Sequence, residues 1–292
     1  MAVSETQLDT WSAQGSIQQS ATTNNSISGV LKDPASPYYP HNFETFLQGS
    51  YGNDTNIWAD SDVDIVIRLS SVYYSDTDDL SPGEKANFDR NWSKAEYSLT
   101  KFKVEVTDWL KENYGAGVDG SGKAIFVPGN GTRRDADVLA CAEHRDYISY
   151  PAYGEPSYRE GIVFWTKDGV KIVNYPKQHS ANCTQKHKDT NAYFKNTVRI
   201  FKNMRNRMID EGWIKEGLAP SYFLEGLLSN VPDRFFAGSY TQTVTNCIDY
   251  ASASDTSEFR CANKHHWLIR NAPVCWSPDD FEAYLRALNA YW

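Results

Sequence analysis

Residues 62 to 69 read Asp-Val-Asp-Ile-Val-Ile-Arg-Leu, an apolar run that opens with two acidic side chains two positions apart. Side chains alternate faces along a β-strand, so Asp62 and Asp64 point the same way while the apolar residues around them point into a core. Carboxylates rarely border so apolar a strand unless a partner neutralises them. The sequence therefore predicts a strand here, with both aspartates on one face of its sheet.

Two carboxylates this close raise each other's pKa unless a cation neutralises them, and hard divalent ions such as Mg²⁺ do this best. Two such ions about 3.5–4 Å apart can activate an attacking hydroxyl and stabilise a pyrophosphate leaving group. We expect the third carboxylate at Asp137, which directly precedes the apolar pair Val138 and Leu139 in another strand-like segment. Asp135 shares the face of Asp137 and is the alternative.

A Gly49–Ser50 pair follows the alternating segment Phe43 to Gln48, with eleven residues between Ser50 and Asp62. Glycine permits close approach of the backbone to a ligand, and a serine hydroxyl with backbone N–H groups can hold a phosphate. The Gly-Ser pair alone, or the acidic pair Asp62 and Asp64 alone, is common in ordinary loops. Together at this spacing, and with a strand after the acidic pair, they indicate a site that binds a donor triphosphate.

The chain has 292 residues, which is enough for one bilobed domain or two closely packed ones. Its first thirty residues are polar and no apolar run is long enough to span a bilayer, so we expect a cytoplasmic protein without a membrane partner. The formal net charge of −8 disfavours tight binding along a long nucleic acid. Small nucleotides with Mg²⁺ are the expected partners.

The five cysteines form an odd set without close pairs, which is typical of reduced thiols rather than of a disulfide framework. A zinc site is not expected either, because the candidate ligands lack the Cys-x₂-Cys spacing that makes such sites specific. Those candidates are Cys247, Cys261, His265, His266 and Cys275.

Turn and cap signals divide the chain into elements. Ser81-Pro82-Gly83-Glu84 carries an N-cap, a first-turn proline and a capping-box glutamate, and predicts a helical region as far as Asn113. The Lys167-Asp168-Gly169 turn predicts a hairpin. We expect helices over Thr6–Gln19 and Asn25–Leu31, strands over Phe43–Gln48, Val63–Leu69, Ala124–Val127, Asp135–Ala142, Gly161–Thr166 and Val170–Asn174, and helices after Pro176.

The region after Pro176 carries a basic stripe on one predicted helix, whose cap is expected at Asp189. Lys195, Arg199 and Lys202 follow each other at i, i+4 and i+7. Such a stripe is either an ordinary solvated face or an anion site. In an acidic chain with a predicted metal site, we favour triphosphate binding.

Pro220-Ser221-Tyr222 opens another predicted helix. The N–H groups at its start and the Ser221 hydroxyl can receive phosphate oxygens. Tyr222 either stacks on a base or fills the core. A last helix is predicted behind Ser277-Pro278-Asp279-Asp280.

Several of these segments together resemble bacterial cGAS/DncV-like nucleotidyltransferases (CD-NTases), over roughly Phe43 to Pro232. The resemblance implies an α+β, polymerase-β-like fold: a catalytic core with a mixed sheet over 41–178, a helical lobe from 1–40 and 179–292, and the donor NTP in the cleft between them. The matching segments are Gln48-Gly49-Ser50-Tyr51 through Asp64, Ala136-Asp137-Val138-Leu139, Asn174-Tyr175-Pro176, Val198-Arg199-Ile200-Phe201-Lys202 and Pro220-Ser221-Tyr222-Phe223-Leu224-Glu225.

The resemblance also implies roles for single residues. Catalytic metal ligands carry over to Asp62, Asp64 and Asp137, and Asn174 falls where related synthases read a base edge. An asparagine there resembles members that accept pyrimidines, although asparagine is also common at hairpin ends. The remaining roles are donor-phosphate contacts at Gly49 and Ser50, triphosphate contacts at Lys202 and Ser221, and base stacking at Tyr222.

The implied activity is synthesis of a cyclic di- or trinucleotide second messenger from NTPs, with UTP and ATP as expected substrates and release of pyrophosphate. The family uses two Mg²⁺ ions, which Mn²⁺ can replace, and signals in CBASS anti-phage defence through an effector protein that senses the cyclic nucleotide, in some systems with accessory proteins. The chain lacks the zinc insertion and the basic DNA-binding surface of animal cyclic GMP-AMP synthase, so we do not expect activation by double-stranded DNA.

Two other interpretations stay open at this point. A nucleotidyltransferase that modifies a tRNA, an antibiotic or a protein would share the metal ligands, but for tRNA it would need a basic acceptor surface. A non-catalytic nucleotide sensor would keep the fold without the activity, and the intact set of aspartates argues against it.

Overall fold

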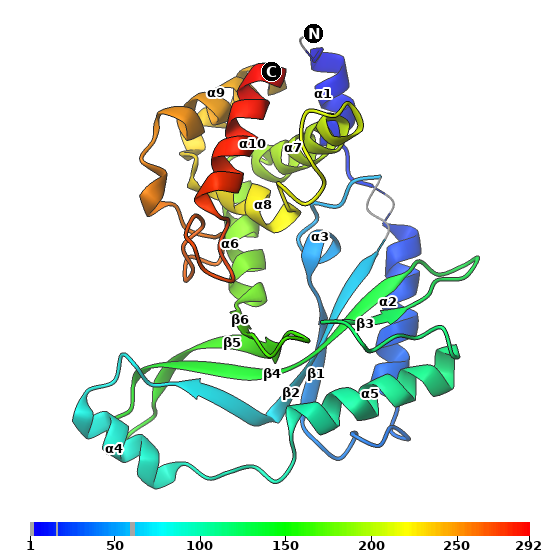
Figure 1. The fold of residues 1–292 in the computed structure, drawn as a ribbon, viewed down its shortest axis with the longest axis vertical. Coiled ribbons are helices and arrows are strands. Elements are labelled where there is room, and N and C mark those ends of the chain that lie inside the picture. The colour runs from blue at the N-terminus through cyan, green and yellow to red at the C-terminus, as the bar shows by residue number, and fades with distance from the viewer. Residues whose placement is uncertain (1–2, 16, 59–61) are drawn as a thin grey trace. The chain divides into compact units, whose positions relative to one another are not determined.

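The computed structural model describes residues 3–15, 17–58 and 62–292. The chain forms two compact units (Figure 1). The sheet unit comprises Gln18–Leu47 and Asp62–Tyr175, and the helical unit comprises Met1–Ile17, Gln48–Ser61 and Pro176–Trp292. The predicted division was a catalytic core over 41–178 and a helical lobe from 1–40 and 179–292. In the structure, residues 18–40 group with the sheet unit and residues 48–61 group with the helical unit.

The sheet unit is built on a mixed sheet with the strand order β1-β2-β4-β5-β6, and β3 pairs with β4. The strands β2 and β4 are parallel, and the other pairs are antiparallel. The predicted hairpin is confirmed as β5 and β6. The strands are β1 (Phe43–Leu47), β2 (Val63–Asp76), β3 (Ile125–Val127), β4 (Ala136–Ser149), β5 (Ser157–Trp165) and β6 (Lys171–Asn174).

Two helices of the sheet unit, α2 (Gln18–Leu31) and α5 (Leu99–Tyr114), cross each other in Figure 1, and both contact the sheet. The buried residues of α5 recur every three to four positions, as an amphipathic helix on a sheet requires. The Trp109 indole N–H donates to the backbone oxygen of Val30 at 2.8 Å and ties the two helices together. Because α2 is held in this way, it belongs to the sheet unit.

The predicted helical region from Ser81 to Asn113 is two helices, α4 (Pro82–Asn91) and α5. The capping box of Ser81 and Glu84 is confirmed at the start of α4. The segment between the helices ends at Ser98, whose hydroxyl accepts a hydrogen bond from the Lys101 N–H and caps α5. The interruption was missed because hydrophobic spacing alone does not reveal an internal cap.

The helical unit packs around α7, whose apolar side chains lie in one buried cluster. The prediction that Asp189 caps this helix is wrong, because α6 continues to Asp189 and Ala192, with φ of 70°, precedes α7. The Ser277 cap is confirmed at α10. The helices are α1 (Glu5–Ser12), α3 (Gly49–Gly52), α6 (Pro176–Asp189), α7 (Tyr193–Asp210), α8 (Ser221–Asn230), α9 (Tyr240–Ala253) and α10 (Pro278–Tyr291), with 3-10 turns at Asp233–Phe235 and Thr256–Glu258.

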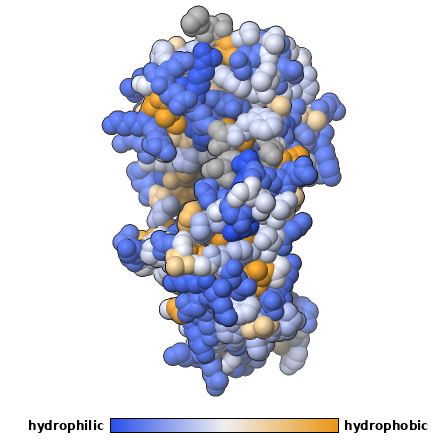
Figure 2. Space-filling view, turned by 90° about the vertical axis from the view of Figure 1, so that its right-hand side faces the viewer, coloured by the Kyte–Doolittle hydropathy of each residue, from blue (hydrophilic) through white to orange (hydrophobic). Residues whose placement is uncertain are grey.

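Hydrophilic side chains cover most of the face seen in Figure 2, and hydrophobic ones form small separate spots. Large apolar residues that are exposed, such as Trp58, Trp92 and Tyr153, are far apart in the sequence. Within the described part of the chain, no helix combines the length and the apolar character needed to cross a membrane.

Candidate active site

The parallel pairing of β2 and β4 sets Asp64 directly opposite Asp137. Paired residues on neighbouring strands point to the same side of a sheet, so these two carboxylates share one face. Both are half-buried, and Asp62, immediately before β2, is exposed. The sheet unit therefore brings together the aspartates that the sequence pattern singled out.

The electrostatics of this face suit a divalent cation. Burial and the negative charge of Asp62 raise the pKa of Asp137 above its ordinary value, and the charge of Lys123 opposes this shift. A cation would relieve the repulsion, and a set of carboxylate oxygens is what hard divalent ions prefer. Asp135, the alternative ligand, instead accepts the Gly129 N–H at 2.6 Å and holds the turn before β4.

The raised pKa of Asp137 makes the stability of the metal-free protein depend on pH. The folded state holds the proton of Asp137 more tightly than the unfolded state does, so the contribution of this group to folding stability decreases as the pH rises above about 4. The melting temperature of Asp137→Asn, relative to that of the wild type, should therefore increase between about pH 4 and pH 7 in EDTA. A difference that stays constant over this range would contradict the shift.

The Gly49–Ser50 pair begins α3, the short helix of the helical unit that follows β1 in the sequence. Gly49 has a φ of 64°, a left-handed conformation that favours glycine. The chain then folds back on itself, because the Asn53 N–H donates to the Gly49 oxygen at 3.1 Å and the Thr55 N–H donates to the Ser50 oxygen at 2.9 Å. We call residues 53–56, which follow α3, the anchor loop.

The basic stripe on α7 is buried, so the interpretation as a solvated face is wrong. The Lys195 ammonium donates to the Asp54 carboxylate at 2.9 Å and Arg199 to the Asp54 backbone oxygen at 2.7 Å. Lys202, with no exposed surface, donates to the Thr55 oxygen at 3.0 Å. All three cations thus hold the anchor loop, and their direct contact with a triphosphate stays a prediction.

Ser221 and Tyr222 lie at the start of α8, in the same helical unit as α7. The Ser221 hydroxyl accepts a hydrogen bond from Arg205 at 3.3 Å. The Tyr222 ring stacks on His179, with ring centroids 4.9 Å apart, and its hydroxyl accepts from Asn263 at 3.0 Å. Their roles toward phosphate and base stay predictions. Pattern reasoning missed His179, because its partners lie far away in the sequence.

Asn174 ends β6 and lies opposite Ile162 of β5. Following the pairing from β4 through β5 to β6 puts Asn174 on the same face of the sheet as Asp137. Its side-chain oxygen accepts the Tyr175 N–H at 2.8 Å, which orients the amide. Gly161 allows this packing, since a Cβ there would come within 2.8 Å of the Asn174 backbone oxygen.

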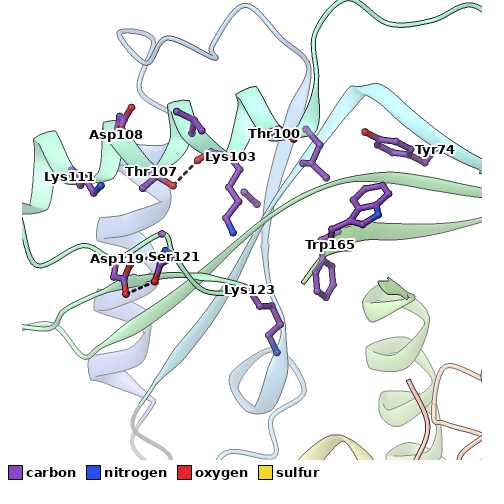
Figure 3. Close-up of a pocket in the computed structure, with 15 residues that line it drawn as sticks. Tyr74, Thr100, Lys103, Thr107, Asp108, Lys111, Asp119, Ser121, Lys123 and Trp165 are labelled. Carbon is purple, nitrogen blue, oxygen red and sulfur yellow. Dashed lines mark hydrogen bonds between the residues drawn. The ribbon is translucent and has the colours of Figure 1, made fainter. Parts of the chain in front are cut away.

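The sheet unit also holds a cavity of about 690 Å³ between α5, the loop 119–123 and the sheet (Figure 3). Lys103 of α5 points into it, and Tyr74 and Trp165 stand at one end. By strand alternation, Ala140 in its floor faces away from the side that carries Asp137. None of the site residues predicted from the sequence lines this cavity.

Residues 181–292 match the family described as the cGAS/DncV-like nucleotidyltransferase C-terminal helical domain. The cyclic UMP-AMP synthase of Rhodothermus marinus is 36% identical over 293 residues, covering 100% of this chain and 98% of that protein. The chain belongs to the bacterial cGAS/DncV-like nucleotidyltransferases. The cyclic nucleotide synthase CdnE01 of Staphylococcus haemolyticus is 33% identical, with 100% of this chain and 99% of that protein covered.

Solved structures of CD-NTases share the fold. The Rhodothermus marinus CdnE c-UMP-AMP synthase has a TM-score of 0.89 at 36% identity, covering 100% of this chain and 97% of that one. The Elizabethkingia meningoseptica CdnE cyclic dinucleotide synthase has a TM-score of 0.79 at 29% identity, with 99% of both chains covered. The predicted polymerase-β-like α+β fold is confirmed.

Membership of the family confirms the predicted activity at the level of reaction class. This CD-NTase is a nucleotidyltransferase that joins nucleotides into a cyclic product. Its substrates are nucleotides, and the family normally uses divalent metal ions. The relatives therefore support cyclic nucleotide synthesis over the two alternative interpretations. These alternatives were transfer to a tRNA, an antibiotic or a protein, and a role as a non-catalytic sensor.

Proposed function

We propose that this CD-NTase joins UTP and ATP into a cyclic dinucleotide, with release of pyrophosphate at each step. The observation that carries the proposal is the likeness to the Rhodothermus marinus cyclic UMP-AMP synthase along the whole chain, at 36% identity and a TM-score of 0.89. Asn174 adds to it, because an amide can donate to one base-edge atom and accept from another.

In the proposed mechanism, Asp62, Asp64 and Asp137 would hold two Mg²⁺ ions, for which Mn²⁺ could substitute. When bound, these ions lower the pKa of the attacking hydroxyl and neutralise charge on the leaving group. Asp137 orients the ribose hydroxyl of the acceptor toward the donor α-phosphate and takes up its proton. The hydroxyl oxygen then forms a new bond to the α-phosphorus as the bond to pyrophosphate breaks. Gly49, Ser50 and Ser221 hold the triphosphate, the charge of the buried Lys202 attracts it from beneath the anchor loop, and Tyr222 stacks on a base. A second round of the same transfer closes the ring.

The proposal extends to the setting of the enzyme. We infer that the enzyme belongs to a CBASS anti-phage system, because the bacterial CD-NTases that it resembles signal in such systems. We also infer a cytoplasmic location, because the proposed substrates are NTPs. The cyclic product would act on a downstream effector protein that binds cyclic nucleotides, and accessory proteins would regulate synthesis.

Rates of pyrophosphate release test the choice of substrates. Each NTP alone and each pair of NTPs is incubated with the enzyme and Mg²⁺, and the UTP and ATP pair should be the fastest by about tenfold or more. A faster reaction with GTP and ATP, or with one NTP alone, would overturn the proposed substrate pair and leave the reaction class intact.

Substitution of Asn174 tests base reading separately. Asn174→Ser should lower the incorporation of uridine relative to adenosine by about fivefold to tenfold, because serine cannot donate and accept along a base edge as an amide can. The ratio is measured from the products made in an equimolar mixture of UTP and ATP. If the ratio does not change, Asn174 only ends the hairpin.

A further inference from the structure

Glu225 of α8 is a charged residue inside the helical unit, only 3% exposed. One of its carboxylate oxygens accepts the Thr55 hydroxyl at 2.5 Å, and the other accepts the Asn53 amide at 3.1 Å and lies 2.5 Å from His179 Nε2. Burial opposes ionisation, but the hydrogen bonds and charges of its partners outweigh it and lower the pKa of Glu225. The residue is therefore a carboxylate whose hydrogen-bond partners lie in the anchor loop and on α6.

The anchor loop connects Glu225 to the backbone that is proposed to bind the donor. Asn53 and Thr55 hold the oxygens of Gly49 and Ser50 through their N–H groups. Lys202, buried below the same loop, donates to the Thr55 oxygen. A shift of Thr55 would therefore move both the Gly49–Ser50 backbone and the lysine that is held against it.

The start of α8 is connected to the same carboxylate. Ser221 and Tyr222 lie about one turn before Glu225 on this helix. Tyr222 also stacks on His179, which in turn contacts Glu225. Three separate segments with proposed triphosphate contacts, namely α3, α7 and α8, thus converge on one buried side chain.

The ligand atoms of His179, Cys183 and Glu225 lie within 4.8 Å of one another, which is close enough to suggest a metal site among the described residues. The contacts favour hydrogen bonding instead. The 2.5 Å between His179 Nε2 and the Glu225 oxygen is a hydrogen-bond distance, and two ligands of one zinc ion stand farther apart. Both carboxylate oxygens already accept hydrogen bonds.

We propose that Glu225, oriented by His179, is a positioning residue that holds the anchor loop, and through it Gly49, Ser50 and Lys202, in the conformation that binds the donor triphosphate. This inference rests on the proposed function, because it needs those residues to act on the donor triphosphate. A buried carboxylate with its hydrogen-bond partners is weak evidence of a role in stability, since well-packed apolar residues often stabilise a core as much.

Thr55 offers a matched pair of variants. Thr55→Val keeps the shape of the side chain and removes the hydroxyl that donates to Glu225, whereas Thr55→Ser keeps the hydroxyl. Binding of non-hydrolysable ATP and UTP analogues is measured by calorimetry, together with KM and kcat of synthesis. We expect Thr55→Val to raise the dissociation constant and KM by about tenfold, with a smaller change in kcat, and Thr55→Ser to restore affinity to within about threefold of the wild type.

Ile248→Val is the control for a purely structural effect. This core residue of α9 lies outside the contacts of the anchor loop, and its truncation lowers stability through a cavity alone. Its KM should equal that of the wild type at a temperature well below unfolding. If Thr55→Val and Ile248→Val both leave affinity unchanged, the inference is overturned while the proposed function stands. A wild type that neither binds nor converts NTPs would overturn both.

Discussion

Replacing Asp64 and Asp137 together by asparagine should lower the rate of pyrophosphate release by at least about 10³-fold. Asparagine keeps the volume of each side chain but lacks the negative charge that a divalent cation needs. Thermal stability should stay the same or improve in the absence of metal, because burial and the charge of Asp62 already raise the pKa of Asp137. Loss of activity with a retained melting temperature would separate chemistry from folding.

Asp135→Asn is the matched control for this experiment. Asp135 shares the strand face of Asp137, and an asparagine oxygen can still accept the Gly129 N–H that the aspartate accepts. Its activity should stay within about threefold of the wild type, because it loses only a charge that supports no reaction step. The third metal ligand would be wrongly assigned if Asp135→Asn were inactive and the single variant Asp137→Asn were active.

Replacing Arg68 by leucine should cost about 2–4 kcal/mol of unfolding free energy. Arg68 is buried on β2 and contacts Glu160 at 2.6 Å, Glu44 at 2.7 Å and Glu143 at 3.7 Å. Removing the cation leaves Glu143, which is 5% exposed, with one basic partner fewer. The expected cost is below that of a fully buried pair, since Glu44 and Glu160 are both more than a third exposed.

Urea denaturation followed by tryptophan fluorescence measures this loss, with Glu44→Gln as the control. The control removes only an exposed partner, so it should change the unfolding free energy by less than about 1 kcal/mol. An Arg68→Leu variant as stable as the wild type would mean that the ion pairs of Arg68 contribute nothing to the stability of the sheet unit.

Local patterns in the sequence were sufficient to predict which aspartates share one face of the sheet. A side-chain period of two sets Asp62 and Asp64 on one side of a strand, and the apolar run after Asp137 predicts the strand that the structure pairs with β2. The Asp-Gly turn likewise predicts the β5–β6 hairpin. These inferences succeeded because each depends on neighbours within a few residues.

The strands β2 and β4 extend farther than predicted, through Asp76 and Ser149. Their distal halves carry polar residues such as Glu143 and Arg145, whose charges are satisfied by pairing inside the sheet. A register shift between Leu69 and Tyr73 also breaks the simple alternation. Neither feature is visible as an apolar pattern.

The buried network of the helical unit could not be predicted for a different reason. Glu225 contacts Thr55 across 170 residues of sequence and His179 across 46, so no local period connects them. The basic stripe on α7 was recognised, but its burial under the anchor loop follows only from the tertiary fold.

Incubation of the purified protein with all four NTPs and Mg²⁺, followed by phosphatase digestion and mass spectrometry, tests the central claim most directly. A cyclic product has no terminal phosphate, so it survives the digestion unchanged, while linear intermediates and unused NTPs lose their terminal phosphates. We expect a phosphatase-resistant species that contains one uridine and one adenosine monophosphate unit. Pyrophosphate release without any resistant product would contradict cyclic dinucleotide synthesis.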